Sequence, residues 1–295
     1  MRKLLIFFTL LAGIIGGILR AYEWRLAWNK DLDLMTPNHY LSLCLLGFSL
    51  LFAAALLFIM LGSPSRRKRE LGPSPRLARA LWWLDAPALL ALFVSAGLDI
   101  REYLLRPAGS ATPGLSSLIF VGFSVFTGIC VLVIMVASAR NVPTRDYGVY
   151  MLTPVFWACF WLVQSIGKYA INPVSLSYLY NLLGTIFAVM ALYAAAGFFF
   201  SQTRIRRSLI YCSLGVYFSI VTLLGVGVYR LLEIINGVQA GFGWAGWVYW
   251  SEWPVSGFRA NDFCRFLFVV FHLLALMRMD RTWKMGLSAS EPAED

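Results

Sequence analysis

Eight long apolar runs dominate the sequence, and each can cross a lipid bilayer as a helix. A spanning helix needs about 20 mostly apolar residues, because each residue advances the helix by about 1.5 Å. In the last run we expect Arg265 to extend the helix by snorkelling towards the lipid headgroups. The sequence therefore predicts an all-α, polytopic transmembrane helix bundle. The predicted spans are residues 4–20, 40–62, 80–98, 115–138, 149–170, 174–200, 207–230 and 262–279.

The composition agrees with this fold class. Hydrophobic residues make up 59% of the 295 residues and charged residues 14%, against roughly 45–50% and 25% in soluble domains. These values exclude a soluble globular protein, a disordered chain and a nucleic-acid-binding protein. We expect a single bundle over residues 1–284, because the spans leave no room for a separate domain. A disordered acidic tail is expected over residues 285–295.

The basic residues indicate how the bundle is oriented. With both termini on the inner side, sixteen of the 25 Lys and Arg residues fall on inner segments and nine on outer ones. Basic residues are retained on the cytoplasmic side of a membrane. The N- and C-termini are therefore predicted to be cytoplasmic, and the expected location is a cell membrane, with the lipid bilayer as the first partner.

The N-terminal segment resembles a secretory signal, but no clear cleavage site follows it. We expect it to be retained as the first span. Gly13 and Gly17 are four residues apart, a spacing that permits close packing of helices in lipid. Such packing would join this helix to another span, or alternatively to a second copy of the chain.

Short similarities suggest that the second half of the chain repeats the first. Residues 51–58 resemble residues 192–199, and a basic loop follows each of them. On this interpretation residues 1–140 and 141–284 are parallel repeats, related by an axis along the membrane normal.

Polar side chains lie at helical spacing along the outer halves of spans five to seven. Gln164 and Lys168 share one face of span five, and a tight hairpin would bring Asn181 to the depth of Gln164. Arg230 and Glu233 lie at the outer end of span seven. These faces predict an outward-opening pocket, where Lys168 and Arg230 offer positive charge to a small polar or anionic ligand. The alternative is interhelical hydrogen bonding, worth about 0.6 kcal/mol per pair.

A tryptophan-rich segment connects spans seven and eight on the outer side. Its four indoles recur at intervals of three residues, which favours a short helix over a strand. Such a helix would lie at the headgroup level, where tryptophan is favoured. The alternative is an aromatic lid over the predicted pocket. The four residues are Trp244, Trp247, Trp250 and Trp253.

Two titratable residues lie within the spans themselves. Asp85, near the inner end of span three, is interpreted as a satisfied interfacial carboxylate, with a proton or cation relay as the alternative. His272 lies in an otherwise apolar part of span eight and is expected to be buried and hydrogen-bonded. Haem ligation would need a second histidine at the same depth, but the other histidine, His39, lies near the outer end of span two. No cofactor is expected, and no His, Cys and carboxylate cluster has the spacing of a metal site.

Enzyme signatures are missing from the sequence. It contains no P-loop motif, no H-E-x-x-H and no G-x-S-x-G, so we expect no catalytic residues. The blocks LTPVFWACFW at residues 152–161 and NPVSLSY at residues 172–178 resemble those of uncharacterised bacterial multi-pass membrane proteins, a resemblance that implies no activity. Two hypotheses follow. The chain binds or transports a small molecule, or it is an accessory, scaffold or sensory-input protein that acts through a membrane or cytoplasmic partner protein.

Overall fold

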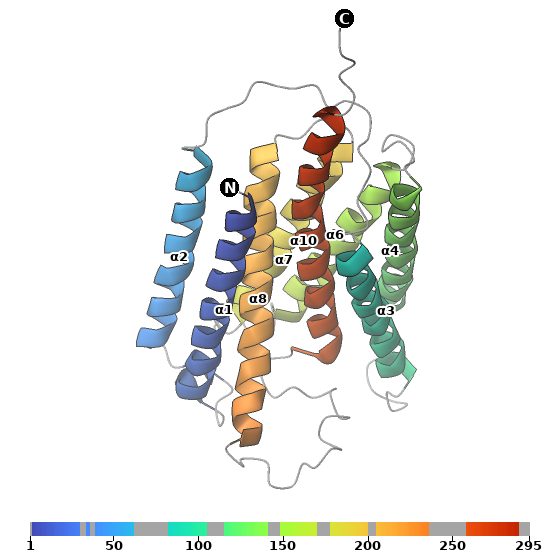
Figure 1. Cartoon of the computed structure of the whole chain (residues 1–295). Helices are drawn as coiled ribbons and strands as arrows, with labels where there is room; N and C mark the ends of the chain where they lie inside the picture. The colour runs from blue at the N-terminus through green and yellow to red at the C-terminus, as the bar shows by residue number, and fades with distance from the viewer. Residues whose placement is uncertain are drawn as a thin grey trace, which may run out of the picture.

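The computed structural model confirms the predicted all-α bundle (Figure 1). In the described part of the chain, eight helices are long and apolar enough to cross a membrane. Each of them overlaps one of the eight predicted spans. The described residues are 2–29, 34–35, 39–61, 82–104, 115–140, 148–169, 178–199, 205–235 and 258–288.

The elements follow one another as helices joined by connections. The first four helices are α1 (Arg2–Ala27), α2 (Tyr40–Leu61), α3 (Trp82–Leu104) and α4 (Leu115–Ala139). The second four are α6 (Leu152–Tyr169), α7 (Leu179–Phe199), α8 (Ile205–Ile235) and α10 (Ala260–Ser288). The 3-10 helix η2 (Gly148–Met151) precedes α6. Between α1 and α2, the strands β1 (Trp28–Asn29) and β2 (Leu34–Met35) pair antiparallel.

Helix α1 is longer than the sequence predicted. The predicted span ended at Arg20, but the helix continues to Ala27. Arg20 is only 1% exposed, and its Nη1 atom lies 2.5 Å from the carboxylate of Glu23, one turn further along the same helix. A charged side chain can remain inside an apolar bundle when an opposite charge accompanies it. The ion pair therefore lets the helix continue past the arginine.

Two helices form the centre of the bundle. In α8, 83% of the most apolar window is buried, and in α10 72%, against 22% in α2. Helix α8 packs against α1, α7 and α10, and α10 also packs along α3 (Figure 1). Side chains around most of the circumference of α8 are therefore buried against other helices. Many side chains of α2, in contrast, are exposed at the surface of the bundle.

Small residues allow α1 and α8 to approach closely. A Cβ atom added to Gly17 would lie 2.5 Å from the Cβ atom of Leu224, and one added to Gly16 would lie 2.8 Å from a methyl group of Val221. Gly13 faces Ile220 in the same way. The glycine spacing in the first span is thus used within the chain, as close packing of α1 on α8.

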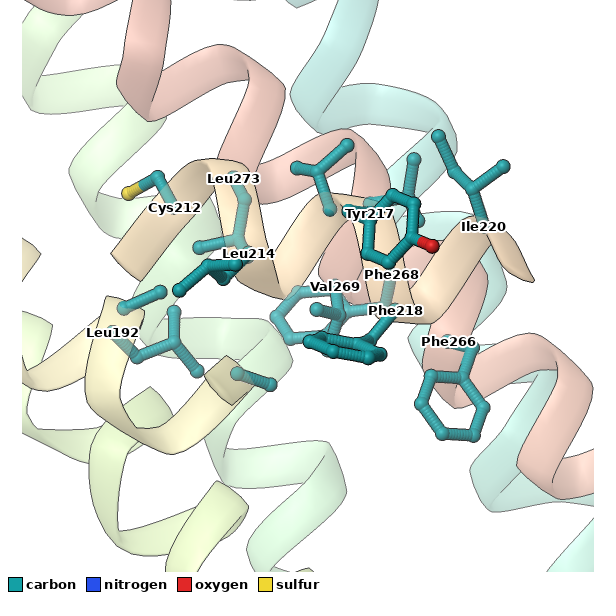
Figure 2. Packing of buried hydrophobic residues seen from close by; sticks show 14 of the residues in the cluster. Leu192, Cys212, Leu214, Tyr217, Phe218, Ile220, Phe266, Phe268, Val269 and Leu273 are labelled. Atoms are coloured by element: carbon teal, nitrogen blue, oxygen red, sulfur yellow. The ribbon is translucent and has the colours of Figure 1, made fainter. Parts of the chain in front are cut away.

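Aromatic and branched side chains fill the core between α7, α8 and α10 (Figure 2). Phe187 and Phe218 stack with their ring centroids 5.2 Å apart. A Cβ atom added to Gly215 of α8 would lie 2.8 Å from Leu273 of α10. These contacts fix the relative positions of the three helices, because an interior packed at crystal-like density has few voids into which a helix could move.

The first and last described residues lie at the same end of the bundle, because the described part of the chain contains eight spanning helices, an even number. The distribution of basic residues predicts that this side is cytoplasmic. Helix α10 continues to Ser288, and the predicted acidic tail lies mostly outside the described residues. The single bundle over residues 1–284 and the repeat of 1–140 by 141–284 stay predictions.

Candidate ligand-binding site

A pocket of about 390 Å³ opens where the outer ends of α3, α4, α6 and α10 meet. In the orientation predicted from the basic residues, this end of the bundle is the outer one. Most of the pocket lining is polar or charged, although these helices are predominantly apolar. The lining residues are Asp99, Glu102, Tyr103, Ser116, Ser117, Phe120, Trp161, Gln164, Ser165, Arg259, Asn261, Asp262 and Arg265.

Arg265 is the centre of the charged lining. Its Nη2 atom donates to both carboxylate oxygens of Asp99, at 2.8 and 2.6 Å, and its Nη1 atom donates to Asp262 at 2.8 Å. The side chain of Arg265 is only 7% exposed. The prediction that Arg265 snorkels towards the lipid headgroups is therefore wrong. Two carboxylates inside the bundle pair with its guanidinium instead.

A second ion pair lies at the mouth of the pocket. Arg259 pairs with Glu102, and these side chains are 39% and 29% exposed. Asn261 donates a hydrogen bond to Asp99. The backbone N–H of Arg259 donates to the carboxylate of Asp262 at 3.3 Å, which satisfies a free donor at the start of α10. The lining thus joins the outer ends of α3 and α10 through charged and amide groups.

Aromatic rings form the apolar part of the pocket. The guanidinium carbon of Arg265 lies 4.6 Å from the ring centroid of Phe120, within the range of a cation–π contact. Trp161 is 1% exposed, and its ring makes an edge contact with Phe266. One turn before it, Trp157 donates from its indole nitrogen to Ser124 on α4 at 2.9 Å. The tryptophans of α6 therefore face α4 and α10.

Sequence reasoning missed the residues that carry most of the charge in this pocket. Asp99 and Glu102 are three residues apart at the outer end of α3. Arg259, Asp262 and Arg265 follow at intervals of three at the start of α10. Each set lies near one helix face, and the outer ends of antiparallel spans meet at the same depth. The signal that could have indicated this site is the pair of oppositely charged helix faces at the outer ends of the two spans. The sequence did not indicate, however, that α3 and α10 are neighbours.

The structure brings one of the predicted site residues into the pocket. Gln164 lines it and donates from Nε2 to the backbone carbonyl of Ser116 on α4 at 3.3 Å. Asn181 is 3% exposed on α7 and does not line this pocket. The pocket therefore differs in place from the prediction, which assigned it to spans five to seven.

The remaining predicted site residues cannot be placed in the pocket. The side chains of Lys168, Arg230 and Glu233 lie outside the described part of the structure. The predicted aromatic lid or interfacial helix also lies outside the described residues. Those residues are Trp244, Trp247, Trp250 and Trp253.

Asp85 and His272 form a buried pair in the inner half of the bundle. The Nδ1 atom of His272 lies 2.9 Å from Oδ1 of Asp85, and the two residues are 3% and 5% exposed. Asp85 is in the first turn of α3, where a carboxylate interacts favourably with the helix dipole. The prediction that His272 is buried and hydrogen-bonded is confirmed. The pair also joins α3 to α10, as Asp99 and Arg265 do at the outer end.

A further polar network links α1, α2, α7 and α8. The guanidinium of Arg20 lies over the ring of Tyr180, 4.9 Å from its centroid. Ser49 donates its hydroxyl proton to the carbonyl of Leu45 at 2.8 Å. The hydroxyl oxygens of Tyr217 and Tyr180 lie 2.9 and 3.3 Å from Ser49 Oγ, so both tyrosines can donate to it. This network is closely packed and lines no part of the outer pocket.

The outer pocket is therefore the described site best suited to a small ligand. Its carboxylates and amide oxygens accept hydrogen bonds, and its guanidinium and amide groups donate them. No group of three His, Cys, Asp or Glu residues that could hold a metal ion occurs in the described ranges. Compared with known protein families, curated proteins and solved structures, the chain matches none.

Proposed function

We propose that this integral membrane protein binds or transports a small polar molecule through the outer pocket, and that it does so in the cytoplasmic membrane of a bacterium. The observation that carries the proposal is a pocket of about 390 Å³ lined by five charged side chains within an apolar bundle. This volume lies within the range of small-molecule sites, about 300–1,000 Å³.

The energetics of buried charge support a functional interpretation of the pocket. A buried ion pair seldom stabilises a protein more than well-packed apolar residues of similar volume. Arg265, Asp99 and Asp262 are therefore difficult to explain by stability alone. Ionisable residues within spanning segments commonly mark pathways for substrates, ions or protons. The pocket opens on the side assigned to the outside, where a ligand can enter from the aqueous phase.

A pocket-filling substitution tests the proposal. The purified full chain is heated with a panel of amines, amino acids, carboxylates and sugars, and the midpoint of unfolding is followed by tryptophan fluorescence. We expect at least one compound class to raise the midpoint in a saturable way, because a ligand that binds only the folded state stabilises it. In Ser117→Trp, where an indole occupies the pocket, the effect should disappear.

The control is Ile119→Trp, which adds an indole to the same helix at a 42% exposed residue outside the pocket lining. This variant should respond to the compound as the unmodified chain does. If no compound raises the midpoint, or if both variants respond equally, the pocket is not a binding site. The accessory or sensory-input hypothesis would then replace this one.

A further inference from the structure

We propose that the ligand of the outer pocket is a neutral molecule with several hydroxyl groups, a polyol or a small sugar, and that the hydroxyl of Ser165 binds it. This inference rests on the proposed function and specifies the chemistry of the same site. It follows from the pairing of the charged lining residues, from the hydroxyl groups that α4 and α6 contribute, and from the burial of the aromatic rings.

The charged groups of the lining are engaged with one another. Arg265 donates to Asp99 and Asp262, and Arg259 pairs with Glu102. Glu102 and Asp262 each make a further interaction as well. A charged ligand would have to take a partner from one of these groups, and breaking a buried ion pair is strongly destabilising. A neutral ligand can enter the pocket and leave every ion pair intact.

Hydroxyl groups are able to use the paired charges as they stand. A carboxylate only accepts hydrogen bonds and a guanidinium only donates them, whereas a hydroxyl does both. At the mouth of the pocket, the side chains of Glu102 and Arg259 are partly exposed although they are paired. A hydroxylated ligand can therefore donate to one and accept from the other. An ammonium could only donate, and a ligand carboxylate could only accept.

Helices α4 and α6 supply hydroxyl groups to the lining. Ser116 and Ser117 are exposed at the start of α4. Ser165 of α6 is only 9% exposed, yet its hydroxyl makes no hydrogen bond within the described part of the chain. Its Oγ atom is not one of the buried atoms that the protein seals off completely, so a molecule in the pocket can reach it.

The unpaired hydroxyl of Ser165 indicates what the ligand must offer. A buried polar group without a partner is costly, and a ligand that supplies the partner recovers that cost on binding. A serine hydroxyl has one donor and two acceptor sites, and a ligand hydroxyl matches both kinds. Nearby, Gln164 donates from Nε2 to the carbonyl of Ser116, and its side-chain carbonyl is a further acceptor.

The aromatic rings of the lining leave little surface for an apolar ligand. Phe120 and Trp161 are almost completely buried, and the guanidinium of Arg265 lies over the ring of Phe120. Only Tyr103, at the mouth, is exposed among the three aromatic residues of the lining. A ligand that fills this pocket therefore meets mainly hydrogen-bonding groups. A small carbon skeleton that carries hydroxyl groups along its length suits such a lining.

Three acyclic six-carbon probes separate the charge classes. Sorbitol is neutral, glucamine is a cation and gluconate is an anion, and glucose and myo-inositol serve as further neutral probes. Each is added to the purified full chain at millimolar concentration and constant ionic strength, and the unfolding midpoint is measured against probe concentration. We expect a saturable rise with at least one neutral probe and none with glucamine or gluconate. Polyols also stabilise proteins by exclusion from their surface, but that effect does not saturate and does not depend on the pocket.

Ser165→Ala tests the residue that carries the inference. The substitution breaks no hydrogen bond among the described residues, so the midpoint without a probe should not fall. The dissociation constant for the active neutral probe should rise about two- to tenfold, as for the loss of one neutral hydrogen bond. The matched control is Ser213→Ala on α8, which removes another buried hydroxyl without a described partner, outside the pocket lining. It should leave the dissociation constant unchanged, and Ser117→Trp should abolish the response.

Each other outcome overturns the inference in a recognisable way. If glucamine or gluconate raises the midpoint at least as much as the neutral probes and Ser117→Trp abolishes the rise, the ligand is charged and the proposed function stands. If the neutral probes have no saturable effect but another compound of the panel acts through the pocket, the proposed function also stands alone. Equal dissociation constants in Ser165→Ala and Ser213→Ala would show that Ser165 does not bind the ligand. A lack of response to any compound would refute the inference and the proposed function together.

Discussion

Replacing Gly17 by alanine would place a methyl group 2.5 Å from the Cβ atom of Leu224 and 3.5 Å from the carbonyl oxygen of Ile220. Carbon atoms in contact normally lie about 3.5–4.0 Å apart. The Cβ atom of Leu224 is fixed to the backbone of α8, so a change of rotamer cannot move it away. Helix α1 or α8 must therefore shift by about 1 Å at this point.

The cost of that shift can be estimated from the packing of α1 on α8. A gap of about 0.5–1 Å loses a quarter to a half of the attraction between two atoms. Overpacking of a closely packed site typically costs about 1–3 kcal/mol. Alanine is a better helix former than glycine by roughly 1 kcal/mol. The net destabilisation by Gly17→Ala is therefore expected to be roughly 0–2 kcal/mol.

A matched control removes the helix-propensity term. At Gly47 of α2, an added Cβ atom would have no neighbour within 4 Å, so Gly47→Ala gains propensity without a clash. The two alanine variants should differ by about 1–3 kcal/mol in unfolding free energy, because only the packing cost distinguishes them. Thermal unfolding of the purified variants in one detergent measures the difference, at roughly 2–4 °C per kcal/mol for chains of 150–250 residues.

The result that would refute this reasoning is simple to recognise. If Gly17→Ala unfolds at the same temperature as Gly47→Ala or above it, α1 and α8 do not touch at this glycine in the folded protein. The first-span glycines would then have to be explained by contact with another molecule, the alternative that the sequence left open.

Two other predictions concern buried polar groups. Asp85→Leu leaves a buried ring nitrogen of His272 without its hydrogen-bond partner and should destabilise the protein by about 1–3 kcal/mol. Adding His272→Phe should recover most of the loss. Equal instability of the single and double variants in thermal unfolding would contradict a specific pair. Ser49→Ala removes the acceptor of Tyr217 and should cost about 1 kcal/mol. The control is Ser95→Ala, because the hydroxyl of Ser95 donates to a backbone carbonyl of its own helix; this variant should lose less unfolding free energy than Ser49→Ala. If chemical unfolding shows a larger loss for Ser95→Ala, the proposed network does not stabilise the protein.

The predictions from sequence succeeded where local composition decides the structure. The apolar runs form helices, because in lipid every backbone N–H and C=O group must be hydrogen-bonded within the segment. Helix ends were predicted less well. The search for apolar runs almost free of charge ended the first span at Arg20. In the structure, its pairing with Glu23 keeps it inside the bundle. The pairing of Asp85 with His272 depends equally on tertiary structure, since the two residues are 187 positions apart.

The sequence by itself determined the all-α fold class, the eight spans and their predicted orientation, because length, apolarity and the sidedness of basic residues are properties of single segments. Only the tertiary structure decided which helices are neighbours. Helices in lipid associate through close packing and a few polar contacts, and these depend on pairs of surfaces. The neighbours α3 and α10 bring Asp99 to Arg265. The candidate site therefore lies between spans three, four, five and eight, where no single segment indicated it.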